Sequence, residues 1–334
     1  MVSMKTFAVK EYKNFVKAVA TNPIDYKRLA NLGKHDEDFE AQEPLTVGWD
    51  ASGVVEQVGD ETSLFQVGDE VMFAGDFFRA GAFAEYVLVD DRIVAKKPSK
   101  SSWSEAAAIP LTSLTAWEAL VDQLKIPEDP EKNKGKTILI TGGAGGVASS
   151  AVQIAKKVLG LTVIATGSRV ETVKYVKELG ADHVINHRFP SMSAQVRSEL
   201  DIENVDYIMH SVDLTPELFT EFVDLVKPFG GIVSVWPSAT VDLMQLFWKS
   251  INFSAVLMFT RPTLKNDAAQ RQHDILERVA ELTDAGVLVS REKTTFKLTL
   301  DNLRKALELQ ASGKAVGKIT LAFEGVQAWS CRRS

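Results

Sequence analysis

The chain has 334 residues, of which 45% are hydrophobic and 25% are charged, and it carries a formal net charge of −6 at pH 7. This length allows two domains and the composition is ordinary for a globular protein, while the negative charge argues against nucleic acid or an anionic membrane as a partner. The single cysteine, Cys331, excludes an internal disulfide and a zinc site built from cysteines. No apolar stretch is long enough to span a bilayer, and no signal-peptide core opens the chain. We therefore expect a cytoplasmic protein.

Residues 1–120 are expected to form a β-rich domain, because short apolar runs alternate there with turn residues. A helix is expected near Ala106, with Ser104 as its N-cap. The polar, proline-containing segment 126–136 indicates a boundary. The expected strands are 54–58, 67–73, 84–89 and 93–95.

Residues 121–260 alternate between strand and helix patterns, with strands expected at 137–141, 162–166, 183–186, 205–210 and 231–236 and helices at 147–159, 171–179 and 216–227. This order predicts right-handed crossovers and a parallel, doubly wound sheet, so the chain belongs to the α/β class. Residues 261–334 are less regular, with helices expected at 273–285 and 300–312 and a closing strand at 318–323.

A glycine-rich turn follows the first strand of this alternating region and leads directly into a helix pattern. Strand, turn and helix in this order set a helix N-terminus against a nucleotide pyrophosphate. Gly142 and Gly143 permit the sharp turn, whereas Gly145 and Gly146 let the backbone approach phosphate. We expect the whole turn to bind a nucleotide: Gly142, Gly143, Ala144, Gly145, Gly146 and Val147.

The end of the second strand favours NADPH over NADH. NAD-binding proteins place a carboxylate there to accept the ribose 2′-hydroxyl, but this chain has Ser168 and Arg169, with no acid before Glu171. A hydroxyl and a guanidinium suit a 2′-phosphate; the alternative is a solvated arginine beside a capping serine. A methyltransferase also has a glycine-rich turn, but it needs the carboxylate that is absent here.

With these residues in view, the chain resembles the medium-chain dehydrogenase/reductase superfamily, and most closely the zinc-free quinone oxidoreductase branch with its zinc-type alcohol dehydrogenase-like proteins. The resemblance implies a GroES-like catalytic domain, an inserted Rossmann domain that binds NADP, and a homodimer or homotetramer. It rests on ATNPIDYK at 20–27, VGWDASGVV at 47–55, GDEV at 68–71, PLTSLTAWEAL at 110–120, the glycine turn, LGADHVINH at 179–187, LMFTR at 257–261 and GKAVGKI at 313–319.

The resemblance also implies that no metal is bound. Members with catalytic zinc carry a histidine ligand where this chain has Trp49, and an indole cannot ligate zinc. The five histidines are scattered without the spacing of ligands. Without a Lewis acid, oxidation of a simple alcohol is disfavoured, and reduction of a quinone or of an activated C=C bond is expected.

The resemblance assigns roles to individual residues. Tyr26 and Asn22 match the family's active-site segment, Tyr26 as a hydrogen-bond donor to the substrate oxygen and Asn22 as an orienting group. Asp25 between them is expected to make a structural hydrogen bond, and Trp49 to line the substrate cleft. Expected contacts to the cofactor come from Thr115, Ser211, Phe259 and Lys318; for each, packing or solvation is the alternative.

We thus expect an NADPH-dependent reductase of quinones or α,β-unsaturated carbonyls that acts by direct hydride transfer on a small-molecule substrate. Two alternatives remain: a nucleotide-binding sensor or structural protein with little catalysis, and a zinc-dependent alcohol dehydrogenase. The ends depart from the family pattern, since residues 4–19 leave no room for the usual first hairpin and the segment after Phe323 is unusual. We expect a shortened first sheet and an exposed sheet edge.

Overall fold

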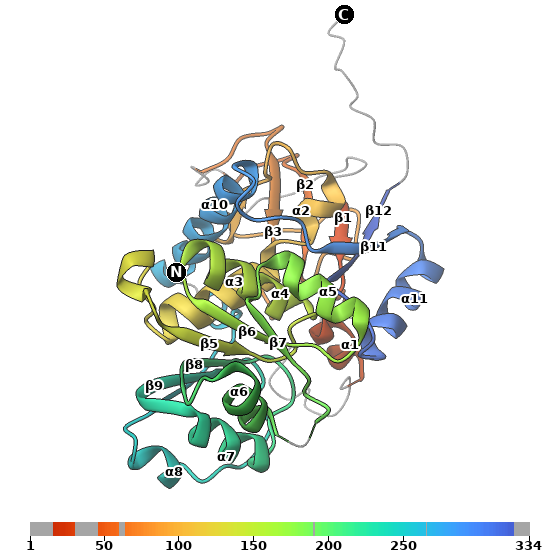
Figure 1. The fold of residues 1–334 in the computed structure, drawn as a ribbon. Coiled ribbons are helices and arrows are strands. Elements are labelled where there is room, and N and C mark those ends of the chain that lie inside the picture. The colour runs from red at the N-terminus through yellow and green to blue at the C-terminus, as the bar shows by residue number, and fades with distance from the viewer. Residues whose placement is uncertain (1–15, 31–45, 60–63, 190, 265, 324–334) are drawn as a thin grey trace, which may run out of the picture. The chain divides into compact units, whose positions relative to one another are not determined.

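A computed structural model describes residues 16–30, 46–59, 64–189, 191–264 and 266–323. The chain divides into two compact units, each built from separate stretches of sequence (Figure 1). The first unit contains residues 1–111, 259–286 and 290–334, and the second contains residues 112–258 and 287–289. Most of segment 4–19, where a shortened hairpin was predicted, and the unusual tail after Phe323 lie outside the described residues; of the first segment only residues 16–19 are described.

The first unit is built on a mixed sheet with the strand order β11-β12-β1-β2-β3-β4. Its strands are β1 (Val16–Ala20), β2 (Ala51–Val54), β3 (Glu70–Phe73), β4 (Val94–Lys96), β11 (Glu292–Lys297) and β12 (Lys318–Ala322), and its helices are α1 (Pro23–Ala30), α2 (Trp103–Ala107), α9 (Thr260–Leu264), α10 (Gln270–Asp284) and α11 (Leu300–Ala311), with short 3₁₀ turns η2 (Asp91–Ile93) and η6 (Asp267–Ala269). Strand β1 pairs antiparallel with both β2 and β12. The last strand in sequence therefore lies beside the first one described.

The second unit is a parallel sheet with the strand order β10-β9-β8-β5-β6-β7. This is the Rossmann order, in which the first strand occupies the centre and the chain runs outward first to one side and then to the other. The strands are β5 (Thr137–Ile140), β6 (Thr162–Thr166), β7 (His183–Ile185), β8 (Val205–His210), β9 (Val226–Ser234) and β10 (Asn252–Ala255), and the helices are α3 (Pro110–Trp117), which begins in the first unit, α4 (Gly146–Gln153), α5 (Val170–Leu179), α6 (Met192–Leu200), α7 (Pro216–Leu225) and α8 (Met244–Phe247). Two π-helical segments, η3 (Glu118–Gln123) and η5 (Ile154–Val158), and a 3₁₀ turn, η4 (Pro130–Asn133), complete it.

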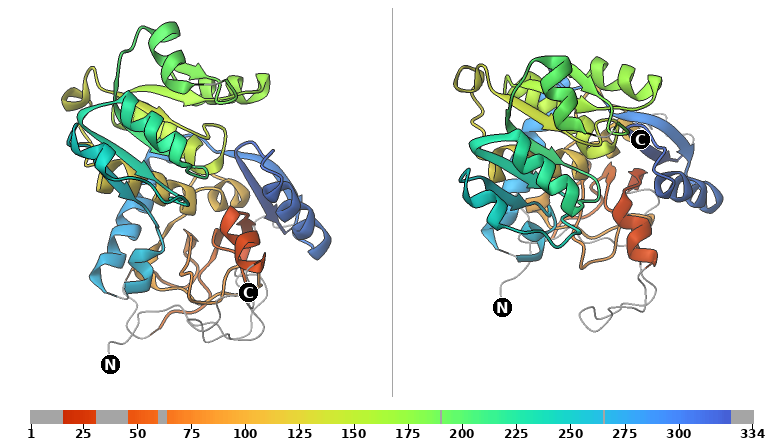
Figure 2. Two further views of the ribbon diagram at one scale, coloured as in Figure 1. Left: turned by 90° about the horizontal axis from the view of Figure 1, so that it is seen from below. Right: turned by 60° about the horizontal axis from the view of Figure 1, so that its bottom comes forward.

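Helices pack in pairs against this parallel sheet: α4 lies beside α5, and α6 beside α7 (Figure 2). The core under α6 and α7 is formed by buried apolar side chains, among them Leu139, Ile208, Phe219, Phe222 and Ile232. The apolar side chains of the helices and of the strands both face this core, so burial of apolar surface drives the packing.

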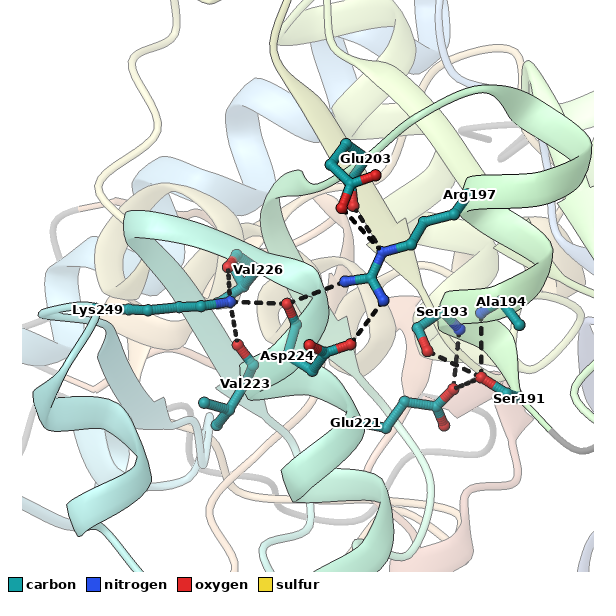
Figure 3. A network of polar contacts seen from close by, with 10 residues as sticks. All are labelled: Ser191, Ser193, Ala194, Arg197, Glu203, Glu221, Val223, Asp224, Val226 and Lys249. Carbon is teal, nitrogen blue, oxygen red and sulfur yellow. Dashed lines mark hydrogen bonds and ion pairs between the residues drawn. The ribbon is translucent and has the colours of Figure 1, made fainter.

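Polar contacts tie α6 to α7 and cap the end of α7 (Figure 3). Arg197 of α6 donates to the Asp224 carboxylate at 2.8 Å. Lys249 donates to the carbonyl oxygens of Val223, Asp224 and Val226 at 2.9, 2.7 and 3.1 Å. A cation at a helix C-terminus satisfies carbonyls that have no partner within the helix and interacts favourably with the helix dipole.

The segment 287–289 belongs to the second unit although its neighbours on both sides belong to the first. Buried Gln153 holds it, because the side-chain amide accepts a hydrogen bond from the Val289 backbone N–H at 2.8 Å and donates to the Val289 carbonyl at 3.2 Å. One side chain thus satisfies both backbone groups of a residue that enters the unit only briefly.

The predicted α/β fold, with a GroES-like part and a Rossmann part, is confirmed, but several local predictions are wrong. Helix α2 is capped by Ser102 rather than Ser104, because Ser102 and Glu105 have the spacing of a capping box and bond to each other's backbone. The strand expected at 54–58 is β2, which ends at Val54. Strand β9 begins at Val226, five positions before the expected start.

The strand expected at 84–89 is absent from the described structure. Within 84–89 the Glu85 carbonyl accepts a hydrogen bond from the Val16 N–H of β1 at 3.1 Å. Just before this region, the Ala82 and Phe83 N–H groups donate to the Gly48 and Val47 carbonyls at 2.7 and 3.0 Å. Segment 84–89 therefore has the composition of a strand but forms no continuous series of backbone hydrogen bonds to a neighbouring strand. Within the described residues, no helix is long and apolar enough to cross a membrane.

Candidate functional site

The carboxyl ends of β5 and β8 mark the point at which the parallel sheet reverses its direction of winding. In open α/β sheets, ligands bind outside the strand ends at this switch point. The glycine turn lies between β5 and α4, and α4 begins at Gly146 with Gly145 as its N-cap. Because glycine has no side chain to cap the helix, the first backbone N–H groups of α4 remain available to an anion.

Two glycines of the turn have no room for a side chain, because neighbouring atoms of the same unit lie too close. Gly142 has φ +71°, and a Cβ there would lie 2.7 Å from the Ser211 Oγ. A Cβ on Gly143 would lie 2.7 Å from the Thr166 carbonyl oxygen. Gly145 has φ −75° and more room, since a Cβ there would meet its nearest neighbour, the Gly142 carbonyl oxygen, at 3.2 Å. The first two positions serve the turn, and Gly145 keeps its outer surface bare.

Side chains from the neighbouring strands fix the turn. Thr166 at the end of β6 accepts a hydrogen bond from the Gly142 N–H at 2.9 Å. The Ser211 hydroxyl donates to the Thr141 carbonyl at 2.7 Å, and the Thr141 hydroxyl lies 2.8 Å from the His210 Nδ1. Burial lowers the pKa of His210, so the ring is neutral near pH 7. The predicted cofactor contact Ser211 is thus a bracing residue of the turn; whether it also touches a cofactor stays a prediction.

Ser168 and Arg169 follow β6 after one glycine, Gly167, and Arg169 is the residue before α5. The Arg169 Nε lies 3.0 Å from a Glu171 carboxylate oxygen, and its side chain is 33% exposed. Both residues line an open groove that also receives Lys174 and Lys177 from α5. The groove therefore presents three cations and a hydroxyl beside the end of the second strand of this unit, together with the carboxylates of Glu178 and Glu199, of which Glu178 lies 3.8 Å from the Lys174 ammonium.

A second polar cluster lies in the first unit, where one edge of its sheet collects three chain segments. Strand β1 ends just before Asn22, β2 begins just after Asp50, and β12 begins at Lys318. Because β1 runs antiparallel to both neighbours, its end meets both of their beginnings. Residues far apart in sequence are brought together by this register.

The side chains of Asn22, Asp50 and Lys318 form one buried hydrogen-bond network. The Lys318 ammonium donates to the Asp50 Oδ2 at 2.8 Å, to the Asn22 Oδ1 at 2.6 Å and to the Thr21 carbonyl at 2.9 Å. The Asn22 Nδ2 donates to the same Asp50 oxygen at 2.9 Å, and the Leu111 N–H donates to the other at 2.8 Å. Asn22, Asp50 and Lys318 are at most 2% exposed. We call these three residues the buried polar network.

Asp25 in α1 adds a second buried carboxyl beside this network. Its Oδ2 accepts a hydrogen bond from the Asn22 backbone N–H at 2.7 Å, which is the structural role expected from the sequence. Burial raises the pKa of Asp25 to about 7, against the opposing influence of the Asn22 N–H and the Lys318 charge. Tyr26, the next residue, is half-buried on the same helix.

The raised pKa of Asp25 predicts a dependence of stability on pH. Between its unfolded value near 3.8 and its folded value of about 7, the folded state holds a proton that the unfolded state has lost. The free energy of unfolding should therefore fall as pH rises through this window, by about 1.4 kcal/mol per pH unit from this one group. Asp25→Asn should remove that contribution to the slope. Urea denaturation of both proteins at several pH values tests this, and equal slopes would contradict it.

Trp49 lies in an aromatic cluster of the first unit. Its indole is 1% exposed and its N–H donates to the Asp76 carbonyl at 3.1 Å. The ring centroids of Phe77 and Phe259 lie 5.3 and 6.1 Å from that of Trp49. The structure thus gathers Trp49 with Phe259, predicted above as a cofactor contact; Phe259 is 4% exposed. Among the described residues, no group of three histidine, cysteine, aspartate or glutamate side chains is placed to hold a metal ion.

The predicted site residues therefore fall into two groups. The second unit carries Thr115, which is buried in α3, the glycine turn, Ser168, Arg169 and Ser211; the first unit carries Asn22, Tyr26, Trp49, Phe259 and Lys318. Sequence reasoning missed Asp50, Thr141 and Thr166. Asp50 had a recognisable signal, because an acid that stands between Trp49 and the small residues at the start of β2 needs a polar partner when it is buried.

Comparisons with known proteins identify the family of the chain. The family model described as "Alcohol dehydrogenase GroES-like domain" matches residues 15–99, and the one described as "Zinc-binding dehydrogenase" matches residues 179–321. A zinc-type alcohol dehydrogenase-like protein of Staphylococcus epidermidis is 38% identical over 312 residues, covering 92% of this chain and 88% of the relative.

Two solved structures extend the comparison. A proposed zinc-dependent alcohol dehydrogenase of Rhizobium etli is 39% identical, with a TM-score of 0.83 over 93% of this chain and 89% of that chain. A quinone oxidoreductase of Coxiella burnetii is 27% identical, with a TM-score of 0.74 over 94% of this chain and 92% of that one. The chain belongs to the medium-chain dehydrogenase/reductase superfamily, in its quinone oxidoreductase-like branch, and is an oxidoreductase of that family.

Proposed function

We propose that the protein is an NADPH-dependent reductase of quinones or α,β-unsaturated carbonyls that works without zinc. The observation that carries this proposal is the burial and hydrogen bonding of Trp49. At the position where catalytic-zinc relatives place a metal ligand, the buried indole of Trp49 donates its single N–H to the Asp76 carbonyl. An activated C=C bond needs no Lewis acid, because the developing enolate or phenolate can be stabilised by hydrogen-bond donors.

The nucleotide edge of the second unit fits a nicotinamide dinucleotide, which family members bind. The uncapped N-terminus of α4 suits the pyrophosphate, and the bare surface of Gly145 allows its close approach. When bound, the reduced nicotinamide supplies the hydride. Arg169 and Ser168 would hold the 2′-phosphate, with Lys177 adding positive charge to the same groove.

In the first unit, Asn22 and Tyr26 are the proposed donors to the substrate oxygen. Hydride transfer to the conjugated carbon would leave negative charge on the carbonyl oxygen, which hydrogen bonds from Asn22 and Tyr26 would stabilise, and solvent would supply the proton that completes the reduction. Asn22 keeps one side-chain hydrogen beyond the one given to Asp50. Tyr26 supplies a hydroxyl from the next turn of the same segment.

The activity test measures NADPH oxidation with a panel of quinones and enones. Turnover with protein that metal analysis finds free of zinc supports the proposal. About one zinc per chain, lost together with activity on chelation, would favour a zinc-dependent alcohol dehydrogenase instead. Binding of NADPH without any turnover would favour a nucleotide-binding sensor.

Cofactor choice gives a separate prediction. Arg169→Ala combined with Ser168→Ala should weaken NADPH binding about 10- to 100-fold, equal to about 1.4–2.8 kcal/mol, because the 2′-phosphate loses its charge-assisted bonds. Binding of NADH, which lacks that phosphate, should change less than twofold. Thermal shifts with each cofactor measure both effects. Equal losses for the two cofactors would show that these residues do not read the phosphate.

An apolar patch on the second unit supports a homodimer, formed with a second copy of this chain. Leu243, Met244, Phe247 and Trp248 are 59, 61, 64 and 84% exposed, and they precede β10, which ends the sheet with a pairing partner on one side only among the described strands. An open strand edge beside a contiguous apolar patch is typical of an interface.

Trp248→Glu should convert this dimer to a monomer, because the introduced carboxylate would have to be buried in the interface. Size-exclusion chromatography with light scattering measures the mass directly. Leu300→Glu, at a side chain 65% exposed on the first unit, is the control and should leave the mass unchanged. A monomeric wild-type protein at micromolar concentration would contradict the proposal.

A further inference from the structure

The Lys318 ammonium has all three of its hydrogens engaged by the protein. They point to the Asp50 carboxylate, the Asn22 amide oxygen and the Thr21 carbonyl, at 2.8, 2.6 and 2.9 Å. An ammonium has three donors and no acceptor. Lys318 is also 2% exposed. All the hydrogen-bond donors of the Lys318 ammonium are therefore used within the first unit.

The network also fixes the orientation of the Asn22 amide. Its oxygen faces the ammonium, which only donates, and its nitrogen faces the carboxylate, which only accepts. In a flipped amide the NH₂ group would face the ammonium, a donor against a donor, and the oxygen would face the carboxylate, an acceptor against an acceptor. The Asn22 backbone N–H is held by Asp25 at 2.7 Å, so the residue is anchored on the main chain as well. One Nδ2 hydrogen is left, and its direction is set by the other contacts.

We propose that Lys318 and Asp50 are positioning residues, which act on the substrate only through Asn22 by holding its amide in one orientation. This inference rests on the proposed function, in which Asn22 donates to the substrate oxygen. It differs from a direct contact between Lys318 and the cofactor, because such a contact would require the ammonium to give up a buried acceptor.

Stability alone does not account for the ion pair. Exchange of a buried ion pair for apolar residues of similar volume is often neutral or stabilising, because the charges are costly to remove from water. The pair therefore calls for a role that an apolar pair could not perform. Orienting a donor to within a small angle is such a role, and an error of about 1 Å in such a group can cost about 100-fold in rate.

The test compares four proteins: wild type, Asn22→Ala, the charge-balanced pair Asp50→Asn/Lys318→Met, and the triple variant. The pair removes both charges together, which avoids leaving an unpaired buried charge. The control is Lys156→Met/Asp182→Asn. It also pairs a lysine with an aspartate, at 2.6 Å, whose second oxygen accepts a backbone N–H, that of Val163 at 2.8 Å.

The pair variant should lower kcat for quinone reduction about 10- to 100-fold, with the Kd for NADPH within twofold of wild type. Added to Asn22→Ala, it should lower kcat no further, because its effect passes through Asn22. The control should retain wild-type kcat. A multiplicative loss in the triple variant, a loss of NADPH affinity that parallels kcat, or wild-type activity in the pair variant would each overturn the inference.

A second measurement does not depend on turnover. The side-chain NH₂ signals of Asn22, identified by their loss in Asn22→Ala, should be two separate resonances protected from exchange with solvent. In the pair variant this protection should fall at least tenfold. Unprotected signals in wild type, or unchanged protection in the pair variant, would overturn the inference. Absence of turnover with every quinone and enone would instead defeat the proposed function, while the amide signals still decide whether the network holds Asn22.

Discussion

Gly145→Ala is expected to weaken NADPH binding about 10- to 100-fold, equal to about 1.4–2.8 kcal/mol, and to lower the melting temperature much less than Gly143→Ala does. The residue has φ −75° and ψ 164°, which alanine adopts readily, and the added Cβ would meet the Gly142 carbonyl oxygen at 3.2 Å. The methyl group would nevertheless stand where a pyrophosphate must approach the N-terminus of α4. Titration calorimetry and a melting curve without cofactor measure the two effects separately.

Gly143→Ala is the matched comparison within the same turn. Its Cβ would lie 2.7 Å from the Thr166 carbonyl oxygen, a backbone atom that cannot move aside on its own. We therefore expect a loss of about 1–3 kcal/mol in the free energy of unfolding as well as a loss of binding. If Gly145→Ala bound NADPH as wild type does, the nucleotide would not approach this turn, and the assignment of the site would be wrong.

Lys318→Met alone should lower the free energy of unfolding by about 3–5 kcal/mol, because it leaves the Asp50 carboxylate buried without its cation. Asp50 is 0% exposed, and burial already raises its pKa despite the neighbouring ammonium. Without that ammonium the carboxyl should take up a proton, so the loss should shrink as pH falls below the pKa of Asp50 in the variant. Urea denaturation at two pH values measures both effects.

Adding Asp50→Asn to Lys318→Met should recover much of the lost stability, since no unpaired charge remains. The control for burial is Lys156→Met, whose pair with Asp182 is 39% and 28% exposed; its loss should stay below about 1 kcal/mol. Equal losses at the two lysines would show that burial of the Lys318 pair has no energetic consequence.

Local patterns in the sequence predicted the second unit well. Strands β6 and β8 have the expected bounds, and β5 ends one residue early, because buried parallel strands give short apolar runs bounded by turn residues. The helix cap of α2 was misplaced by two residues, because two serines compete there and only Ser102 has an acid three positions later. The spacing to Glu105 was visible in the sequence and would have decided between them.

The buried polar network was beyond prediction from local patterns. Asp50 and Lys318 are separated by 268 positions, and only the pairing of β1 with both β2 and β12 brings them together. The resemblance named Lys318 and Asn22 as site residues without showing that they contact each other. The strand register of the whole sheet brings these two predicted residues together with Asp50, which was not predicted, in one network.

The bonds between Gln153 and Val289 limit how the nucleotide unit can be divided from the rest. A fragment of residues 112–258 would lack segment 287–289 and would leave a fully buried amide with neither of its two partners. Unsatisfied buried donors and acceptors cost about 1–3 kcal/mol each, a large part of the stability of a typical domain. Gene fusion or shuffling at the obvious boundaries would therefore destabilise the unit, and a transplantable version of it needs a replacement for segment 287–289 that offers Gln153 one backbone N–H and one carbonyl.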